Sequence, residues 1–132
     1  MQKITFKTNQ EKEIIDITRI INDLLVKNSY DKGMLFLFCT HTSCAITTTN
    51  LKEGMSADLS DAYREIVPKL NYKNPNTPSL SGNFVMSSII GASLAIPVES
   101  ANTVIGSSQR IVLVEFAGPR ERHVTLSFLP EK

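Results

Sequence analysis

The sequence predicts an α+β domain in which a largely antiparallel or mixed sheet of about seven strands packs with two or three helices. Two observations lead to this fold class. Most apolar segments are short and β-branched, and they follow one another mostly without the helix after each strand that a parallel sheet requires. The chain has 132 residues, of which 42% are hydrophobic and 20% charged, as expected for a single domain (residues 1–132) with its own core.

The first third of the chain is predicted to form a strand, a helix and a second strand. Residues 2–7 alternate polar and apolar side chains, which is typical of a half-buried strand. Asn9 can cap a helix that ends near residues 27–29 and has acidic residues in its first turns. Residues 34–39 form a continuous apolar run, which predicts a central strand buried on both faces. The apolar residues at helical spacing are Ile14, Ile17, Ile21, Leu24 and Leu25.

The middle of the chain is predicted to contain a strand, two helices and a loop. Residues 44–49 are β-branched and strand-like, and residues 50–68 return to helical spacing until Pro68 ends the helix. Residues 71–81 are rich in Asn and Pro and predict a surface loop. A short helix over residues 83–90, closed by Gly91, follows.

Four strands are predicted to complete the chain, in two pairs separated by turns at residues 99–102 and 117–120. Residues 111–114 are all apolar, so both faces of that strand carry apolar side chains that must be buried against other parts of the protein. The cover is supplied either by the helices or by another subunit. The four predicted strands are residues 94–98, 103–105, 111–116 and 123–128.

The composition excludes several classes of function. Fourteen basic and thirteen acidic residues give a net charge of +1, and no basic stripe with interleaved aromatic residues is present, so we expect no nucleic-acid partner. No apolar run approaches the roughly 18 residues of a membrane span, and the N-terminal residues alternate like a strand rather than a signal peptide. Two cysteines in such a chain predict reduced thiols and a cytoplasmic location.

The stretch FCTHTSCAITTT places His41 between hydroxyl side chains and close to Cys39 and Cys44. A zinc site needs three or four ligands. The only other histidine, His123, is predicted to lie apart in a late strand, and Cys44 would face away from Cys39 and His41 on an extended strand. A nucleophilic Ser43 would need a base directed at it, and residues on the same face of a strand rarely point at each other. We therefore expect no metal ion and no cofactor.

Two interpretations of His41 remain. It can be an acid/base or anion-binding histidine at a strand end, with Thr42 and Ser43 donating hydrogen bonds to an oxyanion. Alternatively, it is a structural histidine that is hydrogen-bonded to the backbone. Cys39 is predicted to be buried, reduced and not bonded to Cys44, because their Cα atoms lie beyond the roughly 7 Å disulfide limit unless the chain folds back.

Three segments, FCTHTSCAITTTN, GASLAIPVES and IGSSQRIVLVEFAGPRERHVTL, resemble the signature blocks of the YjbQ family, also called UPF0047. The resemblance covers roughly residues 3–130. It implies a compact α+β protein that associates as a homotrimer. It also implies a weak thiamine-phosphate synthase activity, which joins a pyrimidine diphosphate to a thiazole phosphate, at a pocket on a subunit boundary.

The resemblance also implies which residues form the site. His41 is the expected catalytic residue, acting as an acid/base or anion contact. Gly106, Gly118 and Pro119 belong to the same blocks and shape the backbone. The residues expected to bind the substrate or anion are Thr42, Ser43, Asn50, Gln109, Arg110, Glu115 and Arg120. For Arg120 the alternative is a salt bridge in a hairpin turn, and for Glu115 it is a buried partner of an arginine.

The chain departs from the family pattern at polar positions. The family has an acidic residue where this chain has Thr49 and Asn50, and a histidine after a tyrosine where this chain has Tyr72 and Lys73. The family's A-H-x-x segment reads Asn83-Phe84 here, and its tryptophan before glutamine is Ser108. The resemblance therefore implies a divergent member without the further histidines. Such a member either handles phosphorylated small molecules weakly or is a non-catalytic trimeric scaffold or ligand-binding protein.

Overall fold

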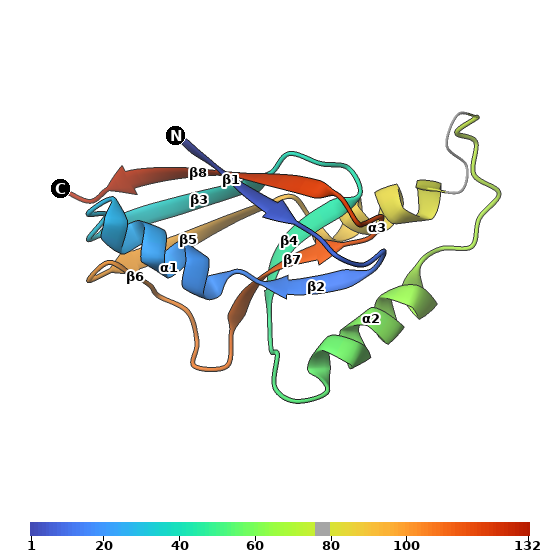
Figure 1. Ribbon diagram of the computed structural model, residues 1–132, viewed down its shortest axis with the longest axis horizontal. Helices are drawn as coiled ribbons and strands as arrows, with labels where there is room; N and C mark the ends of the chain where they lie inside the picture. The colour runs from blue at the N-terminus through green and yellow to red at the C-terminus, as the bar shows by residue number, and fades with distance from the viewer. Residues whose placement is uncertain (76–79) are drawn as a thin grey trace.

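The computed structural model describes residues 1–75 and 80–132, and the described residues form two antiparallel sheets and three helices (Figure 1). One sheet has five strands in the order β1-β8-β3-β5-β6, and the other has three in the order β2-β7-β4. This is the predicted α+β class. The strands are β1 (Gln2–Lys7), β2 (Glu13–Asp16), β3 (Gly33–Cys39), β4 (Cys44–Thr49), β5 (Ser93–Glu99), β6 (Asn102–Thr103), β7 (Arg110–Glu115) and β8 (Glu121–Pro130). The helices are α1 (Thr18–Lys27), α2 (Met55–Ile66) and α3 (Ser81–Ile90).

Strand β3 lies at the centre of the five-stranded sheet, between β8 and β5, as predicted. Its side chains alternate, however. Leu35 and Leu37 are buried in the core, whereas Phe36 and Phe38 are 44% and 51% exposed on the outer face. The prediction that this strand is buried on both faces is therefore wrong for the single chain. Because α1 covers only the inner side of this sheet, the apolar side chains on the outer face of β3 are left uncovered.

Strand β7 is buried on both faces, as the apolar residues at both parities predicted. Ile111 and Leu113 belong to the main core with α1 and the five-stranded sheet. Val112 and Val114 point the other way and pack in a second cluster with Met86 of α3. The chain itself thus supplies the cover that β7 needs, so this strand has no free face for another subunit.

The helix expected to start after Asn9 begins later. Residues 13–16 form β2 instead, which pairs with β7 so that Ile14 lies opposite Val114. The backbone N–H of Asn9 donates to the Glu13 carboxylate at 2.8 Å, so Asn9 does not cap a helix. Helix α1 starts at Thr18, whose N–H donates to Asp16 Oδ1 at 3.0 Å. Pairing with a buried strand outweighs the helical spacing of Ile14 and Ile17.

The turn at residues 117–120 joins the two sheets and is not a hairpin. Strand β7 before it belongs to the three-stranded sheet, and β8 after it belongs to the five-stranded sheet. The peptide bond between Gly118 and Pro119 is cis. A Cβ added at Gly118 would lie 2.2 Å from the carbonyl oxygen of Gln10, so only glycine fits this crossing.

The remaining helices follow the predictions more closely. Helix α3 ends at Gly91, which has a φ of 109°. Helix α2 ends at Ile66, two residues before Pro68, and has no fully buried residue. It lies beside the molecule's body, next to β2 (Figure 1). The predicted loop over residues 71–81 falls partly outside the described residues, and α3 already begins at Ser81.

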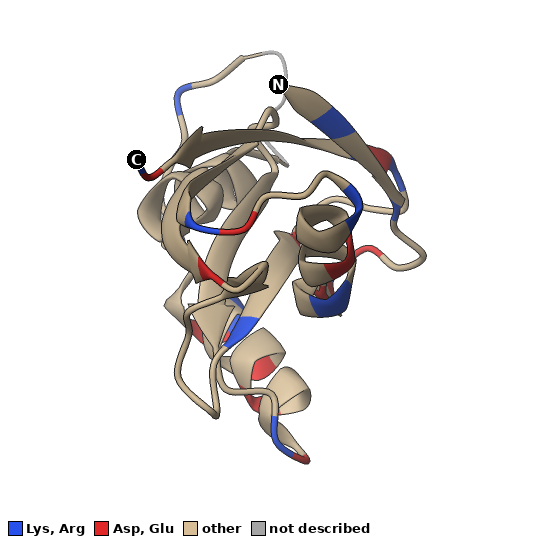
Figure 2. Cartoon of the chain, turned by 90° about the vertical axis from the view of Figure 1, so that its left-hand side faces the viewer, with Lys and Arg blue, Asp and Glu red and all other residues tan. Residues whose placement is uncertain are grey.

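Two general features complete the description. Figure 2 shows basic and acidic residues interspersed along the ribbon. In the part of the chain that the structure describes, none of the helices has both the length and the apolar character required to cross a membrane.

Candidate functional site

His41 lies between β3 and β4, and its ring is close to that of His123. The ring centroids are 5.7 Å apart, with an interplanar angle of 24°. The backbone N–H of His123 donates to Nε2 of His41 at 2.7 Å. His123 was expected to lie apart from this region, and that expectation is wrong. Strand β8 pairs with β3 in a register that places Cys39 opposite Val124, so the residue before Val124 lies next to the end of β3.

These contacts determine the protonation of His41. Burial, followed by the nearby charges of Arg122 and His123, lowers the pKa of the imidazole. Nε2 accepts a hydrogen bond, so the neutral ring carries its proton on Nδ1. His41 therefore has the backbone hydrogen bond of the structural interpretation. Its Nδ1–H is still a donor with no hydrogen-bond acceptor among residues 1–75 and 80–132.

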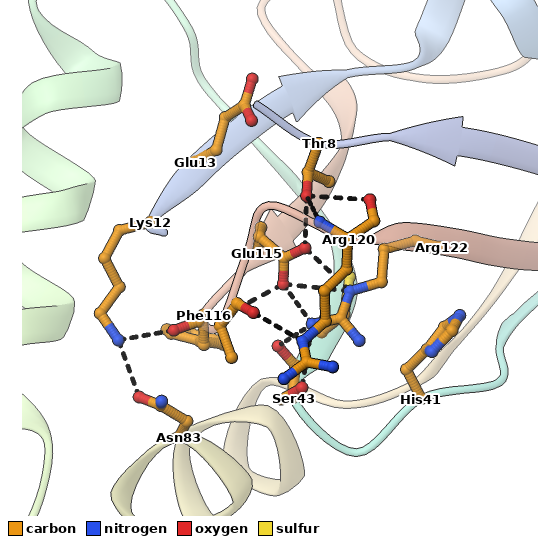
Figure 3. Close-up of polar contacts among 12 residues, drawn as sticks. Thr8, Lys12, Glu13, His41, Ser43, Asn83, Glu115, Phe116, Arg120 and Arg122 are labelled. Atoms are coloured by element: carbon orange, nitrogen blue, oxygen red, sulfur yellow. Dashed lines mark hydrogen bonds and ion pairs between the residues drawn. The ribbon is translucent and has the colours of Figure 1, made fainter. Parts of the chain in front are cut away.

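Close to His41, Glu115 and Arg122 form an ion pair that connects the two sheets (Figure 3). Arg122 Nε donates to Glu115 Oε1 at 2.8 Å, and Nη2 donates to the other carboxylate oxygen. Arg122 Nη2 also donates to the hydroxyl and carbonyl oxygens of Ser43, at 2.9 and 3.1 Å. Glu115 accepts a further hydrogen bond from Thr8 Oγ1 at 2.7 Å. Glu115 is thus the buried partner of an arginine.

The ionised form of Glu115 is stabilised by these contacts. Burial opposes ionisation, but hydrogen bonds from Arg122 and Thr8 outweigh it and hold the pKa of Glu115 below its ordinary value. Glu115 and Ser43 were expected to bind a substrate. Both are buried, with exposures of 1% and 7%, and both are engaged by Arg122. Neither of them is among the residues that line the hollow beside His41.

Arg122 was not among the residues selected from the sequence. The sequence did contain a signal for Arg122. Side chains two residues apart face the same side of a strand, so Arg122 faces the same side of β8 as the buried Val124 and Leu126. An arginine on the inner face of a strand requires a buried acidic partner. Arg120, which was selected, lies before β8 and is exposed. Its Nε donates to the carbonyl of Ala117 at 2.7 Å, and among residues 1–75 and 80–132 Arg120 forms no salt bridge.

An open hollow of about 550 Å³ lies beside His41 and is bordered by α3. Thr42 is exposed at its edge. The Ser87 hydroxyl oxygen is buried and has no hydrogen-bond partner within the described residues. Phe84, in the segment where the family pattern has a histidine, also lines the hollow. A ligand here would meet the imidazole and hydroxyl groups on one side and an aromatic ring on the other.

The other predicted binding residues lie at the opposite end of the β4–β7 pair. Glu115 is paired with Cys44, whereas Arg110 is paired with Thr49, five residues further along β4. This separation is about 17 Å along a strand. The single chain therefore does not bring Asn50, Gln109 and Arg110 to His41.

Each of these three residues has a local partner. Arg110 Nε donates to Asp16 at 2.7 Å, and Gln109 Oε1 accepts from the N–H of Gly106 at 2.7 Å. Asn50 Oδ1 accepts from the N–H of Lys52 at 2.8 Å. Arg110 also borders a shallow hollow of about 210 Å³. These contacts make a second polar cluster, separate from the first.

The cysteines lie close together because the chain folds back between β3 and β4. Sγ of Cys39 donates to the carbonyl of Cys44 at 3.5 Å, and both residues are buried. The burial of Cys39 was predicted, but the fold-back removes the separation along a strand on which the prediction of no disulfide was based. The hydrogen bond with Cys39, together with burial, raises the pKa of Cys44. Within the described residues no three His, Cys, Asp or Glu side chains are grouped as a metal site would require.

Comparisons with known proteins agree with this architecture. Residues 2–131 match the family described as UPF0047 protein YjbQ-like. A UPF0047 protein of Archaeoglobus fulgidus is 30% identical over 96% of this chain and 99% of its own length. The UPF0047 protein YugU of Bacillus subtilis is 28% identical, over 92% and 93%. The crystal structure of hypothetical protein APE1520 from Aeropyrum pernix K1 superposes with a TM-score of 0.90 at 29% identity, covering 98% of both chains.

Proposed function

Because this chain belongs to the YjbQ-like UPF0047 family, we propose that it acts on a phosphorylated small molecule, with His41 as the anion contact and hydrogen-bond donor. The observation that carries the proposal is the Nδ1–H of His41. It is fixed as a donor by the hydrogen bond from His123 to Nε2, at the edge of an open hollow. A donor with a fixed direction stabilises developing negative charge better than a mobile one.

The reaction proposed is a weak thiamine-phosphate synthase reaction. The pyrimidine diphosphate loses pyrophosphate as its carbon forms a bond with the thiazole nitrogen, so negative charge develops on the leaving group. The His41 Nδ1–H, the Thr42 hydroxyl and the exposed guanidinium of Arg120 are the donors available to that charge. The activity is expected to be weak because Phe84 replaces one potential acid/base group, and each such group contributes about 10² to 10⁴ in rate.

We further propose that the site is completed at a subunit boundary of a homotrimer. The outer face of β3, with Phe36 and Phe38, is apolar and exposed, and the same face of the neighbouring strand β8 carries Thr125 and His123. Burial of this face by a second copy would place that copy next to His41. Within one chain Gln109 and Arg110 lie far from His41. Association of two copies would allow Gln109 and Arg110 of one copy to approach His41 of the other.

A second candidate is a ligand-binding or scaffold protein without catalysis. It is favoured by the engagement of Nε2 of His41, which leaves the ring without a free basic nitrogen in its neutral form. It is also favoured by the complete pairing of Glu115 with Arg122 and Thr8. In this case the same hollow would bind an anion without turnover.

The two functions are separated by measuring turnover and binding on the same protein. Purified protein is given the pyrimidine diphosphate and thiazole phosphate, and product is quantified by mass spectrometry. Pyrophosphate binding is measured by calorimetry. Enzymatic function predicts product that His41→Ala abolishes and that Val26→Ala, a control at an exposed position of α1 outside the lining of the hollow, leaves unchanged.

Each other outcome has a defined meaning. Pyrophosphate binding that depends on His41, without product, supports the ligand-binding protein. Full activity in His41→Ala would show that His41 is only structural. Stoichiometric zinc by elemental analysis would contradict the expectation of no metal ion. A protein that shows no binding and no turnover would contradict both the enzyme and the ligand-binding protein, and only the scaffold would remain.

A further inference from the structure

A second cavity lies on the other side of Glu115, away from His41, where α2 packs against β2 and the end of β7. Its volume is about 70 Å³. The floor is apolar, and Lys12, Tyr63 and Arg64 lie among the lining residues. The apolar residues are Ile14, Val67, Met86, Val114 and Phe116.

The ammonium group of Lys12 is held in a fixed position in this lining (Figure 3). Nζ donates to Asn83 Oδ1 at 2.8 Å and to the carbonyl of Phe116 at 2.7 Å. An ammonium has three N–H donors, so one remains. Nζ also lies 5.8 Å from the centre of the Phe116 ring. The side chain thus bridges from the start of β2 to α3 instead of extending into solvent.

The charge of Lys12 has no direct counterion. Both of its acceptors are neutral, and in the described part of the chain no carboxylate lies within ion-pair distance of Nζ. The two carboxylates that border the cavity are engaged elsewhere. Glu115 pairs with Arg122, and Glu13 accepts hydrogen bonds from the backbone of Asn9 and Gln10.

The pKa of Lys12 agrees with this geometry. Burial lowers it, opposed by the charge of Glu11 and assisted by that of Arg64. A half-buried cation with only neutral acceptors is stabilised by an anion that reaches it. A carboxylate that accepted the third N–H would supply the missing charge.

We propose that this cavity binds a small carboxylic acid with a short branched aliphatic chain, its carboxylate on Lys12 and its chain against Ile14, Met86 and Val114. The volume sets the size of the ligand. A cavity of roughly 150 Å³ holds a benzene ring, and this one is about half as large. An alkyl chain of three or four carbons, not counting the carboxylate at Lys12, therefore fits, and an aromatic ring does not. The apolar floor excludes a phosphorylated sugar or nucleotide. The site is independent of His41 and of the function proposed there.

The test uses isovalerate as the probe, with isovaleramide and acetate as matched controls. Binding is followed by ¹H–¹⁵N shifts of the purified protein. Isovalerate should bind about tenfold more tightly than either control, because the amide lacks the charge and acetate lacks the apolar chain. The amides of Ile14, Asn83 and Val114 should shift, and that of His41 should not.

Two variants locate the site. Lys12→Met should weaken isovalerate about tenfold and leave isovaleramide unchanged, whereas Lys7→Met, which removes an exposed lysine of β1, should change neither. Ser60→Leu fills the cavity from α2 without touching Lys12 and should abolish binding of both probes. If Lys12→Met does not fold, Ser60→Leu still tests whether the ligand binds in this cavity.

The proposal is overturned by any of three results. The first is no binding of isovalerate to the unmodified protein. The second is equal affinity for isovalerate and isovaleramide. The third is binding that survives Ser60→Leu. Since none of these measurements involves His41 or turnover, failure here is distinct from failure of the proposed enzymatic function.

Discussion

Arg122 Nε lies 2.8 Å from Oε1 of Glu115, and this pair joins the two sheets of the protein. Arg122 belongs to β8 of the five-stranded sheet, and Glu115 ends β7 of the three-stranded sheet. Both side chains are almost completely buried, at 3% and 1% exposure. Because Arg122 also donates to Ser43, the pair fixes the loop that carries His41.

The first prediction concerns this ion pair. Arg122→Met should lower the free energy of unfolding by about 3–5 kcal/mol, because it leaves the Glu115 carboxylate buried without its partner. The double variant Glu115→Leu, Arg122→Met should cost less than the sum of the single changes. Urea unfolding of the unmodified protein, the two single variants and the double variant measures both effects. Arg64→Ala, which removes an exposed pair with Asp61, is the control and should cost less than about 1 kcal/mol. If Arg122→Met lowered the free energy of unfolding by less than this control does, the ion pair would not be needed for stability.

The second prediction is that the protein loses stability as pH falls in the range where histidine titrates. The pKa of His41 is lowered in the folded state, so below about pH 6.5 the unfolded chain binds a proton that the folded chain does not. Stability is then full at higher pH and decreases as pH falls toward the folded pKa. His41→Gln, which keeps an acceptor for the His123 N–H, should remove this part of the pH dependence in urea unfolding at several pH values. An unchanged pH profile in His41→Gln would contradict the assignment.

A further loss is expected at lower pH from Glu115. Its pKa is lowered in the folded state, so its contribution is present above about pH 4.3 and is lost as pH falls through the folded pKa. Arg122→Met removes the hydrogen bonds that lower the pKa of Glu115, so the loss of stability should begin at a higher pH. Acid titration followed by circular dichroism measures the midpoint, and an identical midpoint in the two proteins would count against the linkage.

The third prediction is that both thiols are unreactive in the native protein. Cys39 and Cys44 are 1% exposed, so a reagent reaches neither sulfur in the folded protein. The hydrogen bond between them raises the pKa of Cys44, together with burial, and lowers the pKa of Cys39, so Cys39 is protected by its burial alone. Since the thiolate is the reactive form, a thiol reagent should label neither residue until urea unfolds the chain. Mass spectrometry of unreduced protein should show no internal disulfide. Rapid labelling of the folded protein would contradict the prediction.

The fourth prediction concerns assembly. The exposed Phe36 and Phe38 predict a homotrimer that buries the outer face of β3. Phe38→Glu places a charge in that face and should give monomers by sedimentation at micromolar concentration, while the fold is retained because the side chain points away from the core. Val26→Glu changes an exposed residue of α1 and is the control, which should stay trimeric. A monomeric unmodified protein would refute the trimer.

Local patterns in the sequence determined much of the fold. The apolar residues of both parities in β7 required cover on two faces, and Gly91 marked the end of α3. The β-branched run predicted β4, and Pro68 marked the end of the α2 region. These features depend on residues within a few positions of each other, so a periodicity or a turn residue is sufficient to reveal them.

Strand pairing decided what the sequence could not. Residues 13–16 became a strand because β7 offered a buried edge, although their spacing also suits a helix. His123 lies beside His41 because β8 pairs with β3, more than eighty residues earlier in the chain. Arg122, and not Arg120, meets Glu115 because Arg122 lies on the inner face of β8, whereas Arg120 precedes the strand and is exposed. The same pairing keeps Gln109 away from His41. Sequence periodicity records which face of a strand is buried, but not which distant strand will be its neighbour, and that neighbour decides the site.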